Sequence, residues 1–243
     1  MNVPASHFFA FTPDTLKDWC ADRSMPTFRA KQILQCVYEK GVADPAQMTN
    51  LSANDRAMLA EDMTFLTGDT LHHQLATDGT QKLLVQWHDG ASDRPAADEA
   101  TQAATAPTAE GLVSLPMLGE PDPTRQTECV MIPTESRKTA CISSQVGCPV
   151  GCRFCASGLG GLDGSLSAGR IIEQVWRLGR LPKVERISHV VFMGMGEPLA
   201  NFAAVEHAIR TLAAPWGMGI SARRITVSTV GLPKAIERLA YRL

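Results

Sequence analysis

The 243-residue sequence has no apolar run long enough to cross a bilayer, so it predicts no membrane span. Residues 1–10 lack both a basic start and a long apolar stretch, which does not fit a secretory signal. No cysteine follows Cys155, and seven cysteines are an odd number, which argues against a disulfide framework. We therefore expect a cytoplasmic protein whose thiols are reduced.

The net charge of −2 is small, but the two signs are unevenly distributed along the chain. Residues 136–243 hold 14 Lys and Arg against 6 Asp and Glu, whereas residues 1–135 hold 9 against 19. A basic half is compatible with a polyanionic partner such as RNA. A solvated charged face is the commoner cause of such a bias, and both interpretations stay open.

Three cysteines stand close together, with spacing C-x3-C-x2-C, at Cys148, Cys152 and Cys155. A [4Fe–4S] cluster with full thiolate ligation takes four cysteines, so three local thiolates leave one iron open for a small molecule. Zinc sites usually show two C-x2-C pairs or a Cys/His pair elsewhere. Only one tight pair is present here, so the pattern favours an iron–sulfur cluster over zinc.

Residues 1–66 predict a small helical module. Thr12 and Pro13 form a typical helix start, and a second helix is expected from Thr27 until Gly41. Ser52 is a candidate N-cap for a third helix. The apolar spacing within these helices is that of one buried face.

Residues 67–135 predict a short antiparallel sheet. Segments 71–76 and 81–87 flank a Thr-Asp-Gly-Thr turn and form a β-hairpin, which a strand at 128–132 extends. Residues 89–125 are rich in Ala, Pro, Thr, Asp and Glu with little periodic apolar content. We expect a flexible insertion there.

Residues 136–243 alternate strands and helices, which predicts an α/β fold with a parallel sheet. Strands are expected at 139–143, 189–193 and 224–228, and helices at 167–178, 203–212 and from 233. The cysteine loop, residues 194–198 and residues 228–231 then all follow the carboxyl ends of strands, where ligands bind in such sheets. Three βα units are too few to close a barrel, so we expect a truncated or fragmentary chain.

Three motifs together resemble one family. They are the run from Cys141 to Cys155 (CISSQVGCPVGCRFC), Gly194–Pro198 (GMGEP) and Ser228–Gly231 (STVG). Their order and spacing are similar to the RlmN branch of the RlmN/Cfr adenosine methyltransferases, which belong to the radical S-adenosylmethionine (SAM) enzymes. Residues 28–33 (FRAKQI) resemble that family's N-terminal domain. The resemblance implies a partial radical SAM barrel behind a helical module.

The resemblance also implies a reaction and its partners. The implied reaction methylates C2 of an adenine in 23S rRNA and in tRNA, with a [4Fe–4S] cluster and SAM as cofactors and an electron donor such as flavodoxin. A cysteine near the family's C-terminus carries the methyl group, and it would lie beyond this chain. A disulfide bond is a further property that the resemblance implies. A Cfr-like methylation at C8 and a non-catalytic, cluster-bearing RNA-binding module are the alternatives.

Individual roles follow from the same resemblance. The cluster ligands are Cys148, Cys152 and Cys155. Gly196, Glu197 and Ser228 match SAM contacts, although a serine there is also a common way to satisfy a turn. Cys141 matches the cysteine that resolves the protein–RNA link, and Glu128 matches the proton acceptor. An inert buried thiol and an exposed strand carboxylate are the respective alternatives.

Overall fold

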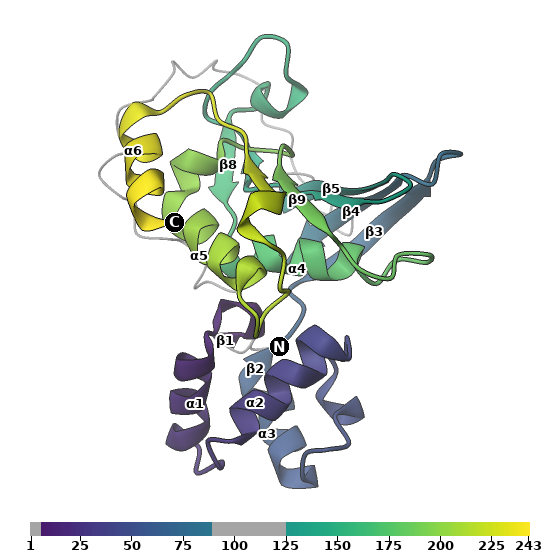
Figure 1. The fold of residues 1–243 in the computed structure, drawn as a ribbon, viewed down its shortest axis with the longest axis vertical. Coiled ribbons are helices and arrows are strands. Elements are labelled where there is room, and N and C mark those ends of the chain that lie inside the picture. Colours follow the sequence, from purple (N-terminus) through teal and green to yellow (C-terminus); the bar gives the residue numbers. More distant parts are fainter. Residues whose placement is uncertain (1–5, 89–124) are drawn as a thin grey trace, which may run out of the picture.

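The computed structural model describes residues 6–88 and 125–243. The insertion predicted at 89–125 therefore lies, except for its last residue, outside the described residues. The helical module occupies one end of the molecule, and a sheet with its covering helices occupies the other (Figure 1). Among the helices that these residues form, none is both long and apolar enough to span a membrane.

The helical module confirms the helix starts predicted at Thr12 and Ser52, whereas the helix expected from Thr27 begins at Arg29 and has no side-chain cap. The side chain of Thr12 caps the first helix by accepting from the amide of Thr15, and the Ser52 side chain caps the third. A short parallel strand pair, which the sequence did not reveal, joins the two ends of the module. Its elements are β1 (Ser6–His7), η1 (Phe8–Ala10), α1 (Pro13–Asp22), α2 (Arg29–Leu34), the π-helix η2 (Gln35–Glu39), η3 (Pro45–Gln47), α3 (Ala53–Asp62) and β2 (Met63–Thr64).

One six-stranded sheet, of order β10-β9-β6-β5-β4-β3, carries the rest of the fold. The predicted hairpin and the strand after it are confirmed as antiparallel neighbours, and β6, β9 and β10 run parallel. The two sets of strands belong to the same sheet, because β5 pairs with β6. The strands are β3 (Gly68–Leu75), β4 (Gln81–Trp87), β5 (Gln126–Pro133), β6 (Lys138–Cys141), β9 (His189–Phe192) and β10 (Ile225–Val227).

Helices cover one face of this sheet. Ser167 caps α4 (Ala168–Leu178), as predicted, and α4 packs beside α5 (Phe202–Ala213), followed by α6 (Pro233–Arg242). Strand alternation directs every second side chain toward these helices. The buried apolar residues of this sheet are Leu83, Val85, Trp87, Cys129, Met131, Ala140, Val190 and Phe192.

The opposite face of the sheet is more polar. One row across it is fixed by strand register and contains Lys82, Val130, Cys141, Val191 and Thr226. None of these side chains belongs to the buried core. This open face is therefore the surface on which polar groups from neighbouring strands meet.

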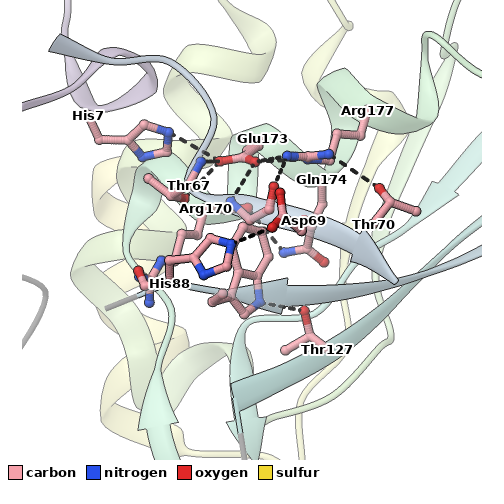
Figure 2. A network of polar contacts seen from close by, with 12 residues as sticks. His7, Thr67, Asp69, Thr70, His88, Thr127, Arg170, Glu173, Gln174 and Arg177 are labelled. Carbon is pink, nitrogen blue, oxygen red and sulfur yellow. Dashed lines mark hydrogen bonds and ion pairs between the residues drawn. The ribbon is translucent and has the colours of Figure 1, made fainter. Parts of the chain in front are cut away.

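A buried carboxylate joins the helical module to the sheet. Glu173 on α4 accepts from the amide and hydroxyl of Thr67 at 2.9 Å each and from the amide of Gly68 at 3.3 Å. Arg177, one turn along α4, donates to it at 2.8 Å, and His7 Nε2 of the helical module lies 3.3 Å away (Figure 2). The Glu173 side chain is fully buried, so these partners replace its hydration.

Candidate functional site

The cysteine loop begins on a short hairpin formed by β7 (Gln145–Gly147) and β8 (Leu162–Ser165). Gly147 has φ +73°, and a Cβ there would lie 2.1 Å from the carbonyl oxygen of Gly161. Only glycine fits this close approach. The next amide, that of Cys148, donates to the same carbonyl at 2.9 Å, so the hairpin fixes the start of the loop.

The loop then turns so that its cysteines remain near one another. The Cys155 amide donates to the carbonyl of Cys152 at 3.0 Å, and all three thiols are half-buried. Burial raises the pKa of the Cys148 thiol, and the neighbouring Cys155, Glu197 and Cys152 raise it further. The field of these groups therefore disfavours negative charge at Cys148 until a cation offsets it.

This loop fits a cluster better than a single metal ion. The loop offers three thiols, and no His, Asp or Glu lies between Cys148 and Cys155. Zinc binds each thiolate at about 2.3 Å and so draws its sulfurs into one tight tetrahedron. A [4Fe–4S] cluster instead binds each thiolate on a different iron, which suits three thiols spread along one loop.

The residues before the cysteines pack against the loop that follows β9. Met195 accepts from the amides of Ser144 and Gln145 at 2.8 and 3.2 Å, and its own amide donates to Ser143 Oγ at 2.9 Å. Gly196 has φ +101°, and a Cβ there would lie 2.6 Å from Gln145 Cβ. The predicted SAM-binding loop is thus held directly beside the strand that leads to the cluster ligands.

Glu197 connects this loop to the third motif. Its side chain is almost fully buried, and Oε1 accepts from the amide of Leu199 at 2.9 Å. Oε2 accepts from the amide of Val230 at 2.7 Å, inside the loop that follows β10. Ser228 lies two residues earlier in that loop and is exposed. The structure therefore brings all three predicted loops together at the carboxyl ends of adjacent strands.

Glu128 and Cys141 lie on the open face of the sheet, one strand apart. Glu128 Oε1 forms an ion pair with Lys82 Nζ at 2.8 Å, and the Glu128 carbonyl accepts from Ser143 Oγ at 2.7 Å. Burial raises the pKa of the half-buried Cys141 thiol, while a hydrogen bond from the Met193 backbone opposes that shift. The two side chains share a face without a direct contact between them.

The expected disulfide bond is wrong for this structure, in which all seven cysteines are free. Cys129 lies on β5, the strand beside Cys141, but the two side chains point to opposite faces of the sheet. Cys141 stands opposite Val130, so Cys129 points to the other face of the sheet, and strand geometry keeps the two sulfurs apart. Cys20 and Cys36 are buried in the helical module, as small core residues.

Several buried polar side chains that support the loops were missed at the sequence level. Gln174 on α4 accepts from the Ser143 amide at 2.8 Å and donates to its carbonyl at 3.0 Å. Asn201, in η7 (Pro198–Asn201), donates to the Ser144 carbonyl at 2.9 Å. The polar run Ser143–Gln145 next to the cysteines was the available signal, but its partners are distant in sequence.

Comparisons with known proteins agree with this geometry. Residues 142–241 match the radical SAM superfamily, and residues 7–64 match the ribosomal RNA large subunit methyltransferase N-terminal domain. A crystal structure of a radical SAM methyltransferase from Sphaerobacter thermophilus superposes with a TM-score of 0.79 and 32% identity, over 97% of this chain and 60% of that one. The fold and site thus define a radical SAM protein.

Curated relatives specify the branch. A probable dual-specificity RNA methyltransferase RlmN from Rhodopirellula baltica is 39% identical over 97% of this chain and 54% of the relative. The RlmN of Bdellovibrio bacteriovorus is 37% identical, over 98% and 51%. These matches give the chain an RlmN-type N-terminal domain followed by a radical SAM domain, and both imply a [4Fe–4S] cluster and SAM as cofactors. The chain spans about half the length of these curated relatives.

Proposed function

We propose that this chain contributes the cofactor-binding part of a methyltransferase that modifies C2 of an adenine in 23S rRNA and in tRNA. Three thiols, Cys148, Cys152 and Cys155, hold the cluster in this proposal. Gly196, Glu197 and Ser228 bind SAM, and a donor such as flavodoxin supplies electrons. The methyl-carrying cysteine belongs to the part of the relatives that this chain does not span.

One observation carries the proposal: the cysteine loop and the Gly194–Pro198 loop are hydrogen-bonded to each other through residues 143–145. A cluster bound to the first and SAM bound to the second would be neighbours. The two bound cofactors supply a 5′-deoxyadenosyl radical, and this is chemistry that amino-acid side chains lack. The electron-poor C2 carbon of adenine is a poor nucleophile and needs such a reagent.

Two residues on the open face, Glu128 and Cys141, have the remaining roles in this proposal: one accepts the C2 proton and the other resolves the covalent protein–RNA link. In this proposal Glu128 accepts the proton that leaves C2. The Glu128 carboxylate is half-exposed and lies outside the buried core. The Cys141 thiolate attacks the sulfur of the methyl-carrying cysteine: an S–S bond forms, the S–C bond to the base breaks, and the carbon keeps that electron pair and takes up a proton to leave as the methyl group of the base. Both residues lie on the open face, on adjacent strands, and in this proposal the adenine binds over that face.

The test uses anaerobic reconstitution of the 243-residue chain. We expect about four irons and four sulfides per chain and reductive cleavage of SAM to 5′-deoxyadenosine under strong reductant. Cys152→Ser should lose both the iron–sulfur content and SAM cleavage. The control variant, Cys20→Ser, should keep both properties, because the Cys20 thiol is buried in the helical module.

Further outcomes separate the alternatives. A chain that binds RNA and its cluster but never cleaves SAM would be the non-catalytic RNA-binding module. If a longer chain of the same protein methylates RNA, mass spectrometry and NMR of the modified nucleoside distinguish C2 from the Cfr-like C8 position. Stoichiometric zinc without charge-transfer absorption would refute the cluster.

A further inference from the structure

Gln145 lies between the two loops that hold the cofactors in the proposed function. Its side chain is 1% exposed. Its amide oxygen accepts from the Glu197 backbone amide at 2.9 Å, and its amide nitrogen donates to Ser165 Oγ at 3.1 Å. Both ends of the side chain therefore have a partner, one in the Gly194–Pro198 loop and one on β8.

The same side chain also packs against Gly196. Gln145 Cβ and Cγ lie 2.6 and 2.8 Å from the position that a Gly196 Cβ would occupy. The Gly196–Glu197 peptide is thus confined sterically by the stem of Gln145 and oriented by its amide oxygen. Gly196 has φ +101°, a region that glycine reaches without strain, so the contacts with Gln145 select this orientation of the peptide among those open to a glycine.

Gln145 is also the first residue of β7, three residues before Cys148. The hairpin pairing of Gln145 with Ser165 holds that strand in place. A displacement of the Gln145 side chain would change the position of the Gly196–Glu197 peptide relative to Cys148. Gln145 therefore connects the predicted cluster ligand Cys148, through the chain, to the Gly-Glu pair, through its side-chain hydrogen bond to the Glu197 amide.

We propose that Gln145 is a positioning residue, which sets the separation between the SAM-binding peptide at Gly196–Glu197 and the cluster ligand Cys148. This inference rests on the proposed function, since it presupposes that these loops bind SAM and the cluster. Removing the side-chain amide of Gln145 would leave the Gly196–Glu197 peptide free to reorient, and SAM would then bind a less preorganised site.

The surrounding hydrogen bonds predict that the fold tolerates such a change. The backbone of Ser143 is held by Gln174, and the Ser144 carbonyl accepts from Asn201. These bonds do not involve the Gln145 side chain. A Gln145→Met variant, which keeps the volume and the unbranched stem, should therefore retain β7 and bind the cluster.

The experiment compares Gln145→Met with Ser165→Ala, which removes the other partner of the same amide. One lost hydrogen bond to a buried group corresponds to about a five- to ten-fold change in an equilibrium constant. We expect Gln145→Met to weaken SAM binding by about that factor in calorimetry, with iron content unchanged, and to alter the SAM-induced change in the cluster's EPR spectrum. Ser165→Ala should match the wild type.

Hydrogen exchange gives a second measurement that needs no cofactor. The Glu197 amide should exchange faster in Gln145→Met than in Ser165→Ala, because only the first variant removes its acceptor. If Gln145→Met does not fold, Gln145→Asn serves instead, since it is one methylene shorter and cannot reach that amide.

The outcomes separate this inference from the proposed function. Wild-type SAM affinity in Gln145→Met, or a Glu197 amide that stays protected from exchange in that variant, would overturn the role of Gln145 while the proposed function stands. Loss of iron in both Gln145 variants would also overturn it, because the residue would then support the loop in general. A wild-type chain that binds no SAM with its cluster loaded would refute the proposed function itself.

Discussion

Replacing Glu173 by glutamine should weaken the attachment of the helical module to the sheet. The Oε2 atom accepts from the amide and hydroxyl of Thr67 and lies 3.3 Å from His7 Nε2. The Oε1 atom accepts from the amide of Gly68 and from Arg177. Thr67, Gly68 and Arg177 all donate hydrogen bonds to this carboxylate, and Figure 2 shows Thr67 and Arg177 beside it.

The expected magnitude follows from that arrangement. A glutamine amide has one acceptor and one NH2 group, so whichever way it turns, the NH2 faces donors. In either orientation at least one backbone amide loses its acceptor in a buried site, which costs about 1–3 kcal/mol, and the ion pair with Arg177 is lost as well. We expect Glu173→Gln to lower the free energy of unfolding by about 2–5 kcal/mol, within the range for breaking a buried ion pair.

Urea unfolding of the two proteins at pH 7 measures this difference, provided that the m-value is unchanged. Asp14→Asn is the matched control, because its exposed ion pair with Lys17 contributes about 0–1 kcal/mol. Amide exchange at Thr67 and Gly68 should also accelerate in Glu173→Gln. A change in unfolding free energy no larger than that of the control would refute this account of the network.

The same residue predicts how stability depends on pH. Burial alone would raise the pKa of Glu173, but the hydrogen bonds and charges of His7, Arg177 and Thr67 outweigh it and hold that pKa below its usual value of 4.5. A depressed pKa contributes stability above the unfolded value, and this stability is lost as the pH falls below about 4.5 through the folded value. Glu173→Gln should remove this part of the acid sensitivity.

The remaining predictions concern the candidate site and the last helix. Glu197→Gln should weaken SAM binding about tenfold in calorimetry and leave iron content unchanged, because it removes a charged acceptor and no cluster ligand; equal affinity would exclude Glu197 from the site. Glu206 accepts from Arg210 and from Arg242 of α6 at 3.0 and 2.8 Å, so Glu206→Gln should accelerate hydrogen exchange in α6 several-fold more than in α4. Uniform exchange across both helices would contradict a local role for that pair.

Local signals in the sequence predicted most of the elements. Thr12 with Pro13, Ser52 and Ser167 each cap a helix where the sequence places one, because a capping bond joins residues only three positions apart. The hairpin of β3 and β4 was equally local. The three loops of the candidate site could be anticipated, since the carboxyl ends of parallel strands meet at one edge of a sheet.

Features that depend on distant pairing could not be predicted in this way. The pairing of β5 with β6 joins the antiparallel and parallel strands, and no periodicity in either segment records that register. Glu173 lies within the helix expected at 167–178, and no local signal distinguishes it there. Its donors at Thr67 and Gly68 are more than 100 residues away in sequence.

The motif residues of the site have structural as well as chemical reasons for their identity. Glu197 already accepts one backbone amide on each carboxylate oxygen, and these bonds join the loops after β9 and β10. Each oxygen keeps a further lone pair, so the same carboxylate can hold an ammonium group of a ligand without giving up the loops. Gly196 is required by packing against Gln145 and Ser144 before any ligand is considered. A substitution in this motif therefore tests ligand binding only when the exchange of the Leu199 and Val230 amides shows that both loops have stayed in place.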